Sequence, residues 1–208
     1  MVKAQNAARR AAVAPPKATP RRSARSRDPE RTRELLLATA ARAFDRDGYF
    51  GTDTNRIAKE AGFAPATLYR YFDDKRALFL ATYERWVEAE WAALFARLDA
   101  RPTGSGRGAA HKRSLAQAVV DHHRRWAGLR ASLLGLVASD PEVAAFRVAS
   151  RARQLEWLTP LLSRKDARSR ALFVLLAFER VADSIALGEA PALGVGEAEL
   201  LDQLCGLI

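Results

Sequence analysis

Residues 61–72 read AGFAPATLYRYF, and this stretch decides the architecture of the amino-terminal part of the chain. A short helix with apolar side chains at helical spacing precedes it and ends at Gly62, where glycine readily takes the left-handed conformation that closes a helix. Pro65 fits the first turn of a second helix, in which Leu68 and Phe72 lie four residues apart on the inward face. Three residues separate the two helices, a spacing typical of a helix-turn-helix.

The outward side of this second helix follows from the helical period. Thr67 and Arg70 are expected to face most directly outward, while Tyr69 and Tyr71 project from the two flanks, within reach of phosphates. The Arg70 guanidinium can donate two hydrogen bonds to O6 and N7 of a guanine in the major groove. Lys75, at the start of the following helix, is placed to hold a phosphate. A three-helix packing module with ordinary polar surface residues would have the same spacing, so the spacing alone leaves both interpretations open.

The stretch from Ala61 to Phe72, followed by DDKRAL, resembles the DNA-binding domain of the tetracycline-repressor (TetR) family of bacterial transcription regulators. The preceding LLLATAARAFDRDGYFGTDTNRIAKE is similar to the first two helices of that family, so the resemblance covers roughly residues 30–80. This chain departs from the family pattern at Ala64, where a serine often caps the helix, and at Tyr71, often a histidine. The resemblance implies DNA contacts from Thr54, Pro65, Thr67, Tyr69, Arg70, Tyr71 and Lys75.

The net charge of the 208-residue chain is +10, and most of it lies near the amino terminus. Residues 1–33 contain ten basic and two acidic side chains and therefore account for +8. Residues 1–27 are rich in Ala, Pro, Ser and Arg, a composition too poor in large apolar side chains to offset the entropy of ordering. They are interpreted as a disordered basic arm, which either binds a polyanion such as DNA or is a solvated tail.

Apolar residues recur at helical spacing through the rest of the chain, which predicts an all-α fold. Residues 28–76 form the expected three-helix DNA-binding domain, and a long helix joins it to a larger helical effector-binding and dimerisation domain, residues 77–208. The loop RPTGSGRG, residues 101–108, interrupts the pattern. The expected helices of the larger domain span about residues 75–98, 115–136, 141–158, 166–187 and 197–208.

The last two expected helices are apolar on more than one face, with Leu176 and Leu204 among the residues that broaden the apolar stripes. A monomer would expose much of this surface, so the second face is assigned to a symmetric partner. The resemblance also implies a homodimer formed through these helices. Complete burial within one larger core is the alternative.

His122 interrupts an apolar stripe, so its imidazole is expected to point inward and to need a hydrogen-bond partner. It is either a satisfied core histidine or the polar anchor of a mostly apolar small-molecule site. A metal site at Asp121, His122 and His123 is not expected, because adjacent helical residues point about 100° apart. The expected pocket is lined by Trp86, His122, Trp126, Phe146, Trp157 and Phe178.

Several other protein classes find no support in the sequence. The single cysteine, Cys205, excludes an intrachain disulfide, and the longest apolar run is far shorter than a membrane span. The arginine-bearing, proline-rich amino terminus is a poor signal peptide, so a cytoplasmic protein is predicted. No phosphate loop, dinucleotide fingerprint or nucleophile elbow is present, so neither an enzyme nor a cofactor is predicted.

The predicted function is that of a homodimeric repressor bound to a palindromic operator in double-stranded DNA. A small apolar or aromatic effector, whose identity the sequence leaves open, would release it. One alternative is an architectural DNA binder without an effector, whose basic arm supplies most of the affinity. Another is a helical enzyme that uses the aromatic cavity.

Overall fold

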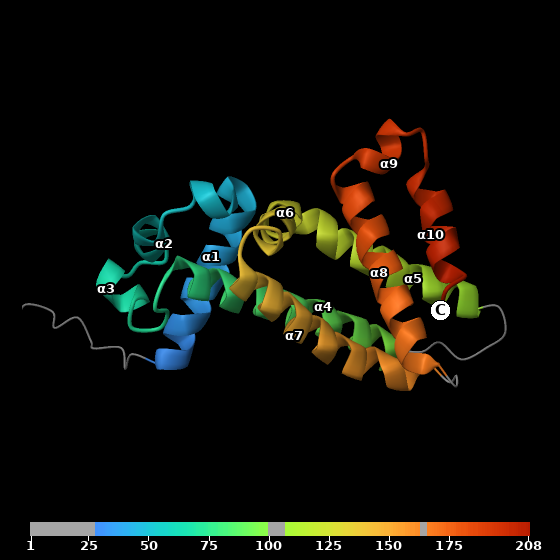
Figure 1. The fold of residues 1–208 in the computed structure, drawn as a ribbon, viewed down its shortest axis with the longest axis horizontal. Helices are drawn as coiled ribbons and strands as arrows, with labels where there is room; N and C mark the ends of the chain where they lie inside the picture. Colours follow the sequence, from blue (N-terminus) through green and yellow to red (C-terminus); the bar gives the residue numbers. More distant parts are fainter. Residues whose placement is uncertain (1–27, 100–106, 163–165) are drawn as a thin grey trace, which may run out of the picture.

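The computed structural model describes residues 28–99, 107–162 and 166–208, and no strand occurs among them (Figure 1). The all-α prediction is therefore confirmed. The elements are α1 (Pro29–Gly51), α2 (Thr54–Glu60), α3 (Pro65–Leu68), α4 (Lys75–Asp99), α5 (Arg107–Arg125), α6 (Ala127–Val137), α7 (Pro141–Leu158), the 3₁₀ turn η1 (Thr159–Leu161), α8 (Ala167–Ala186), α9 (Glu189–Ala192) and α10 (Glu197–Cys205).

The ends of α1 are set by local residues, an N-cap aspartate, a proline in the first turn and a glycine near the end. Asp28 is the N-cap, and its side chain accepts hydrogen bonds from the amides of Glu30 and Arg31 at 3.0 and 3.3 Å. Pro29 occupies the first turn, where its missing N–H has no helical partner to lose. Gly48 has a φ of +69°, so regular helix stops there and one further turn follows.

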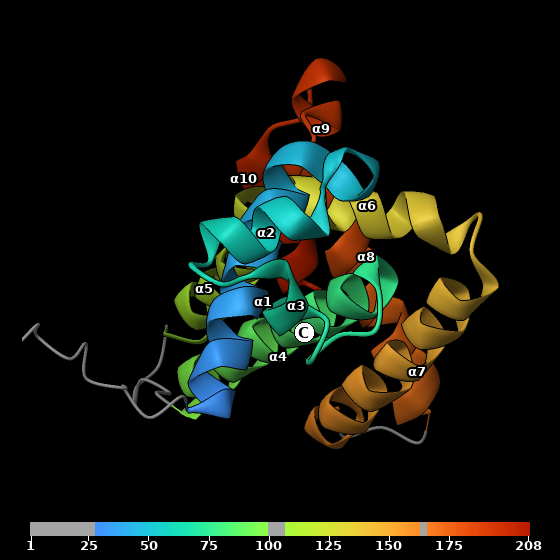
Figure 2. The same ribbon diagram turned by 90° about the vertical axis from the view of Figure 1, so that its left-hand side faces the viewer.

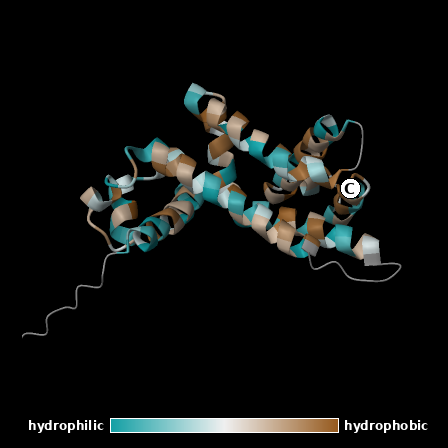
Figure 3. Cartoon of the chain, turned by 90° about the horizontal axis from the view of Figure 1, so that it is seen from below, coloured by the Kyte–Doolittle hydropathy of each residue, from teal (hydrophilic) through white to brown (hydrophobic). Residues whose placement is uncertain are grey.

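The three amino-terminal helices lie at one end of the molecule, and α4 extends from them into the larger bundle (Figures 1 and 2). One buried cluster crosses the expected domain boundary, since Phe44 and Phe79 pack edge to face in the same core as Leu129. Figure 3 shows apolar and hydrophilic residues interspersed along the long helices, as expected for helices buried on one side only. The expected DNA-binding domain therefore packs on the larger domain through a continuous apolar core.

The expected single helix over residues 115–136 is wrong, because the structure breaks it at Trp126 into α5 and α6. Trp126 has φ −126° and ψ +36°, outside the helical region. The break lets the amides of Gly128 and Leu129 bond to Asp45 in α1 instead of to the preceding turn. A contact between two domains thus overrides a continuous helical pattern.

The connection before the terminal helix also differs from the expected loop. Gly188, with a φ of +78°, ends α8, and the short helix α9 follows directly. Pro191 is the third residue of α9, a position in the first turn where proline is tolerated. The terminal helix α10 ends at Cys205, three residues before the predicted end.

Candidate nucleic-acid interface and internal cavity

The helix-turn-helix consists of α2 and α3, joined by the glycine turn that the sequence predicted. Gly62 has a φ of +83°, and its amide donates to the Lys59 carbonyl at 3.0 Å. The Phe63 amide donates to the Ala58 carbonyl at 2.8 Å, and these two bonds form a Schellman closure. Ala64 precedes α3 and offers no side-chain cap, as its departure from the family pattern predicted.

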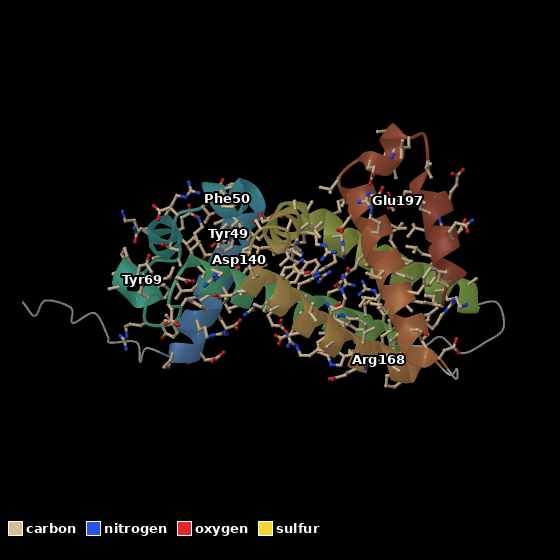
Figure 4. The ribbon with its side chains drawn as sticks, in the orientation of Figure 1. Tyr49, Phe50, Tyr69, Asp140, Arg168 and Glu197 are labelled. Atoms are coloured by element: carbon tan, nitrogen blue, oxygen red, sulfur yellow. The ribbon has the colours of Figure 1, made fainter. Side chains whose placement is uncertain are left out.

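The second helix of this motif is shorter than expected. Regular α-helix ends at Leu68, and the next residues close tighter turns, in which the Arg70 amide donates to the Thr67 carbonyl at 3.2 Å. Leu68 and Phe72 are nevertheless buried, with 0% and 5% of their surface exposed. Arg70 and Tyr69 are exposed, and Figure 4 places Tyr69 at the outer side of α3. The buried Leu68 and Phe72 and the exposed Arg70 thus agree with the predicted faces, whereas Thr67, expected to face outward, is partly buried. The helix itself is shorter than predicted.

Thr54 and Tyr69 belong together in this surface. Thr54 is buried and its hydroxyl lies 2.9 Å from the Tyr69 hydroxyl. Thr54 therefore holds the flanking tyrosine from α2, and its own side chain is not freely exposed. Pro65, Thr67 and Tyr71 are partly buried at the same end of the molecule.

Lys75 lies beside this surface, and its ammonium group already makes contacts within the chain. Its Nζ donates to the Thr52 carbonyl oxygen at 2.9 Å and lies 4.6 Å from the centre of the Tyr49 ring. An ammonium has three donor hydrogens, so a phosphate can still be bound. The Asp74 carboxylate accepts a hydrogen bond from the Ala77 amide at 2.7 Å, which caps α4.

The expected larger domain contacts the expected DNA-binding domain through residues that the sequence did not single out. Asp45 in α1 accepts hydrogen bonds from the amides of Gly128 and Leu129 at 2.9 and 3.1 Å. The Tyr49 amide donates to the Ser132 hydroxyl at 3.0 Å. A Cβ atom at Gly128 would collide with the Asp45 carbonyl oxygen. The sequence signal for this contact was a glycine in the interior of an expected helix, because such a glycine marks a possible close approach of two backbones.

A buried ionic network lies behind this contact. Arg130 in α6 donates to Asp183 in α8 at 3.2 to 3.3 Å, to Glu179 at 3.1 Å and to the Tyr83 hydroxyl at 2.7 Å. Arg147 in α7 donates to Glu179 at 2.7 and 2.8 Å and to Tyr83 at 2.9 Å. Burial raises the pKa of Tyr83, so this hydroxyl stays protonated. The network therefore ties α4, α6, α7 and α8 together.

His123, rather than His122, is the satisfied core histidine, which corrects the expectation from the apolar stripe. Its side chain is 1% exposed, and Nδ1 lies 2.8 Å from Asp183 while Nε2 lies 3.4 Å from Glu90. Burial opposes its protonation, but the hydrogen bonds to the two carboxylates outweigh burial and raise its pKa to about 9. His122 instead packs against Trp86, with the ring centroids 4.7 Å apart. Its Nε2 meets no hydrogen-bond partner among the residues that the structure describes, and burial lowers its pKa.

A cavity of about 420 Å³ lies between α4, α5, α8 and the ends of α7 and α10. Leucines and valines form most of its wall, together with Trp91 and Phe178. Glu90, Glu179, His111 and Lys112 are the charged and titratable side chains that line it.

The six residues predicted to form a pocket do not line this cavity together. Phe178 alone among them belongs to its wall. Trp86 stacks on Tyr83 at 5.1 Å, and Trp157 packs against Trp91 at 5.4 Å from outside the wall. Phe146 packs edge to face against Tyr83, and Trp126 lies at the break between α5 and α6. Most of these aromatic side chains pack in the hydrophobic core. Helical spacing in the sequence identifies an apolar face but does not show whether that face borders a cavity.

The expected partner surface on the last helices is only partly exposed. Phe173 and Leu176 in α8 are 55% and 46% exposed, and Leu187 follows at 55%. Leu204 in α10 is 2% exposed, so it belongs to the core of one chain and not to an open face. An exposed second apolar face is thus present on α8, whereas the central leucines of α10 are buried in the core of the same chain.

The helices that the structure describes include none with the length and apolar character needed to span a membrane. Within the same residues no group of three or more histidine, cysteine and acidic side chains is arranged to hold a metal ion. The basic arm, residues 1–27, lies outside the described part of the chain.

Residues 36–82 match the family described as bacterial regulatory proteins, tetR family. The nucleoid occlusion factor SlmA of Pasteurella multocida is 31% identical over 129 residues, which cover 61% of this chain and 62% of that protein. A TetR-family transcriptional regulator from Streptomyces coelicolor has the same fold, with a TM-score of 0.60, 26% identity and coverage of 86% and 93% of the two chains. A transcriptional regulator from Rhodococcus sp. RHA1 aligns with a TM-score of 0.62 and 22% identity over 85% and 95%.

The chain spans less than two thirds of the length of the curated relatives that it matches. The family model matches residues 36–82, which include the helix-turn-helix. The structural likeness extends over both domains, but at these identities it speaks mainly to the fold.

Proposed function

Because the chain belongs to the TetR family of bacterial regulatory proteins, we propose that it is a homodimeric transcriptional repressor, released from a palindromic operator by a small, largely apolar ligand. The observation that carries this proposal is the exposed pair Tyr69 and Arg70 in the turns that directly follow α3, held by the buried Leu68 and Phe72. A planar guanidinium on an exposed helical turn is suited to reading guanine in the major groove.

The positioning of the flanking groups supports this role. The Thr54 hydroxyl fixes the Tyr69 hydroxyl, so the ring is preorganised at the edge of the surface. Lys75 retains donor hydrogens beside the first turn of α4. Phosphate contacts from such groups fix the register of the helix on the duplex, while Arg70 reads a base.

Symmetric pairing follows from the apolar face of α8. Phe173 and Leu176 lie on one side of the helix, three residues apart, and both are exposed. Burying them against the same residues of a second copy would form a two-fold interface. Two recognition helices related in this way would meet half-sites about 34 Å apart, which requires a palindromic operator.

Release by a ligand needs a physical connection between the cavity and α3. Glu179 lines the cavity and bonds to Arg130 in α6. Two residues earlier in α6, Gly128 bonds to Asp45 in α1. A ligand that moves α8 or α4 would therefore displace α6 against the DNA-binding domain and change the separation of the recognition helices.

Selection of bound sequences from a random duplex library tests the proposal. The full chain should enrich a palindrome with half-sites one helical turn apart, and a single-base change within a half-site should cost about 1 to 3 kcal/mol of binding free energy. Equal affinity for the selected and random duplexes would instead indicate an architectural DNA binder. Arg70→Ala is the matched variant, because it should reduce binding to the selected duplex far more than binding to random duplexes.

A further inference from the structure

The cavity is apolar along its length and polar at its two ends. Leu94 and Leu98 from α4, with Leu115 from α5, form part of the apolar wall. Glu90 lies at the end of the cavity nearest the buried ionic network. His111 lines the cavity near the amino-terminal end of α5, away from that network. His111 precedes Val119, which also lines the cavity, by eight residues, about 12 Å along a helix. The space therefore suits an elongated molecule with polar groups at both ends.

Glu90 is the carboxylate with hydrogen-bonding capacity left for a ligand. Glu179 also lines the cavity, but its two oxygens already accept from Arg130, Arg147 and Arg151. Glu90 is 9% exposed, and His123 Nε2, at 3.4 Å, is its ion-pair partner among the described residues. A carboxylate can accept several hydrogen bonds, so Glu90 can accept a further one from a donor inside the cavity.

The charge around Glu90 favours a neutral donor over a cation. The buried network contains three carboxylates, Glu90, Glu179 and Asp183. The cations facing them are His123, Arg130, Arg147 and Arg151. Because the four cations outnumber the three anions, an ammonium group would add positive charge to a cluster that already has an excess. A hydroxyl group can donate to Glu90 without that cost.

The other end of the cavity suits a hydrogen-bond acceptor on the ligand. His111 Nε2 is buried and meets no hydrogen-bond partner within the described chain. Lys112 lies next to it in the wall, and its ammonium donates to the carbonyl oxygen of Ile208 with two further hydrogens to offer. A carboxylate can accept hydrogen bonds from both side chains at once. A hydroxyl group or a hydrocarbon end could satisfy these two donors only in part.

We propose that the cavity binds an elongated aliphatic acid with a hydroxyl group at its far end, the hydroxyl donating to Glu90 and the carboxylate accepting from His111 and Lys112. This inference rests on the proposed function, because it names the ligand class of a ligand-released regulator. The methylene chain would lie along the leucines and valines between the two polar ends.

Calorimetric titration of the full chain with three acids of one length tests the far end of the ligand. The probes are ω-hydroxydecanoate, decanoate and ω-aminodecanoate, which differ only in the group that would face Glu90. A hydrogen bond to a charged acceptor should make the hydroxy acid bind about tenfold more tightly than decanoate. Decanediol, which lacks the carboxylate, should bind more weakly than the hydroxy acid. Equal affinities for the first two acids, tightest binding of the amino acid, or binding of none of them would overturn the proposal.

Variants separate the two ends of the cavity. Glu90→Gln should reduce the preference for hydroxydecanoate over decanoate severalfold and leave the affinity for decanoate nearly unchanged. His111→Phe should weaken both acids alike and keep the preference. Glu88→Gln, an exposed change in the same helix, is the matched control and should change neither. A preference that survives Glu90→Gln unchanged in a folded protein contradicts the assignment of Glu90.

The binding of the same protein samples to duplex DNA is measured separately, in the absence of the acids and the diol. A protein that binds its selected duplex but none of the four probes would contradict the ligand class and leave the regulatory function standing. A protein that binds hydroxydecanoate but no duplex in preference to random DNA would contradict the proposed function and retain the ligand assignment.

Discussion

Asp45 in α1 accepts a hydrogen bond from the amide of Gly128 in α6 at 2.9 Å, and the glycine has no side chain to hold the two backbones apart. The acceptor belongs to the DNA-binding domain and the donor to the larger domain. The carboxylate lies at the amino-terminal end of α6, where free amides and the helix dipole favour a negative charge. Arg130, two residues further on, joins the same helix to the buried ionic network. This contact links the helix that carries Arg130 to the domain that holds α3.

Gly128→Ala should destabilise the protein by about 1 to 3 kcal/mol, because the new methyl group collides with the Asp45 carbonyl oxygen. Gly135→Ala is the control in the same helix, where nothing lies within 4 Å of an added Cβ. It should stabilise α6 by about 0.5 to 1 kcal/mol, since alanine favours helix. Urea denaturation measures both changes. Equal effects of the two substitutions would show that the close approach at Gly128 is unimportant.

The free energy of unfolding should fall as the pH rises towards 9. The folded-state pKa of His123 is raised from 6.5 to about 9, so its protonation contributes stability fully below pH 6.5 and loses that contribution as the pH passes through 9. The contribution corresponds to about 3 kcal/mol. Denaturant titrations across this window should show the decline in the natural protein and a much flatter profile in His123→Gln. Parallel profiles for the two proteins would contradict it.

Arg70→Ala and Lys75→Ala should weaken DNA binding in different ways. Arg70 is exposed in the turn that follows α3, so its loss should cost about 1 to 3 kcal/mol on the preferred duplex and relax the preference at one base. Lys75→Ala should weaken all duplexes about equally, because a phosphate contact reads no base. It should also lower stability, since Lys75 donates to the Thr52 carbonyl. Affinities for the duplex and its single-base variants at one salt concentration provide the test. The reverse pattern would make Thr67 and Tyr69 the stronger candidates for base reading.

Leu176→Glu should yield a folded monomer that binds its palindrome more weakly. The natural protein should sediment near twice its 22.9 kDa, and the variant near the monomer mass. Leu176 is 46% exposed, so a carboxylate there is tolerated by one chain but not by an apolar partner surface. Leu204→Glu should instead lower the stability of each chain, because Leu204 is 2% exposed. A natural protein that sediments as a folded monomer at micromolar concentration would refute the dimer.

Deletion of residues 1–27 should reduce the affinity for the operator and for random DNA by similar factors. Most of the net charge of the chain lies in or next to this arm, and phosphate neutralisation reads no bases. The slope of log affinity against log salt should flatten by about 0.9 for each phosphate contact that is lost. If the slope is unchanged, the arm takes no part in binding.

Local chemistry determined the amino-terminal architecture, and the sequence was sufficient to predict it. Asp28 and Pro29 start α1, and Gly62 closes α2 with a positive φ. The alternation of Leu68 and Phe72 with polar neighbours assigned the inward and outward faces of the recognition segment. Each of these features depends on a residue's own backbone preference or on the helical period, so no distant partner is needed to predict it.

The larger domain was predicted only in outline, because its details depend on pairs of residues far apart in the chain. The stripe through Val119 and His122 suggested that His122 points inward, whereas the buried face turns by one residue to His123. Asp183, sixty residues away, pairs with His123 and so decides which of two adjacent histidines is buried.

The helix break at Trp126 and the cavity wall both result from contacts between helices that are far apart in the sequence. Asp45 competes with the preceding turn for the first amides of α6, and the packing of α8 against α5 leaves a void beside Glu90 and His111. The sequence by itself determined which segments are helical and which faces are apolar. Only the tertiary structure decided which polar groups meet and where space remains, because hydrogen bonds and voids are made by side chains from different helices.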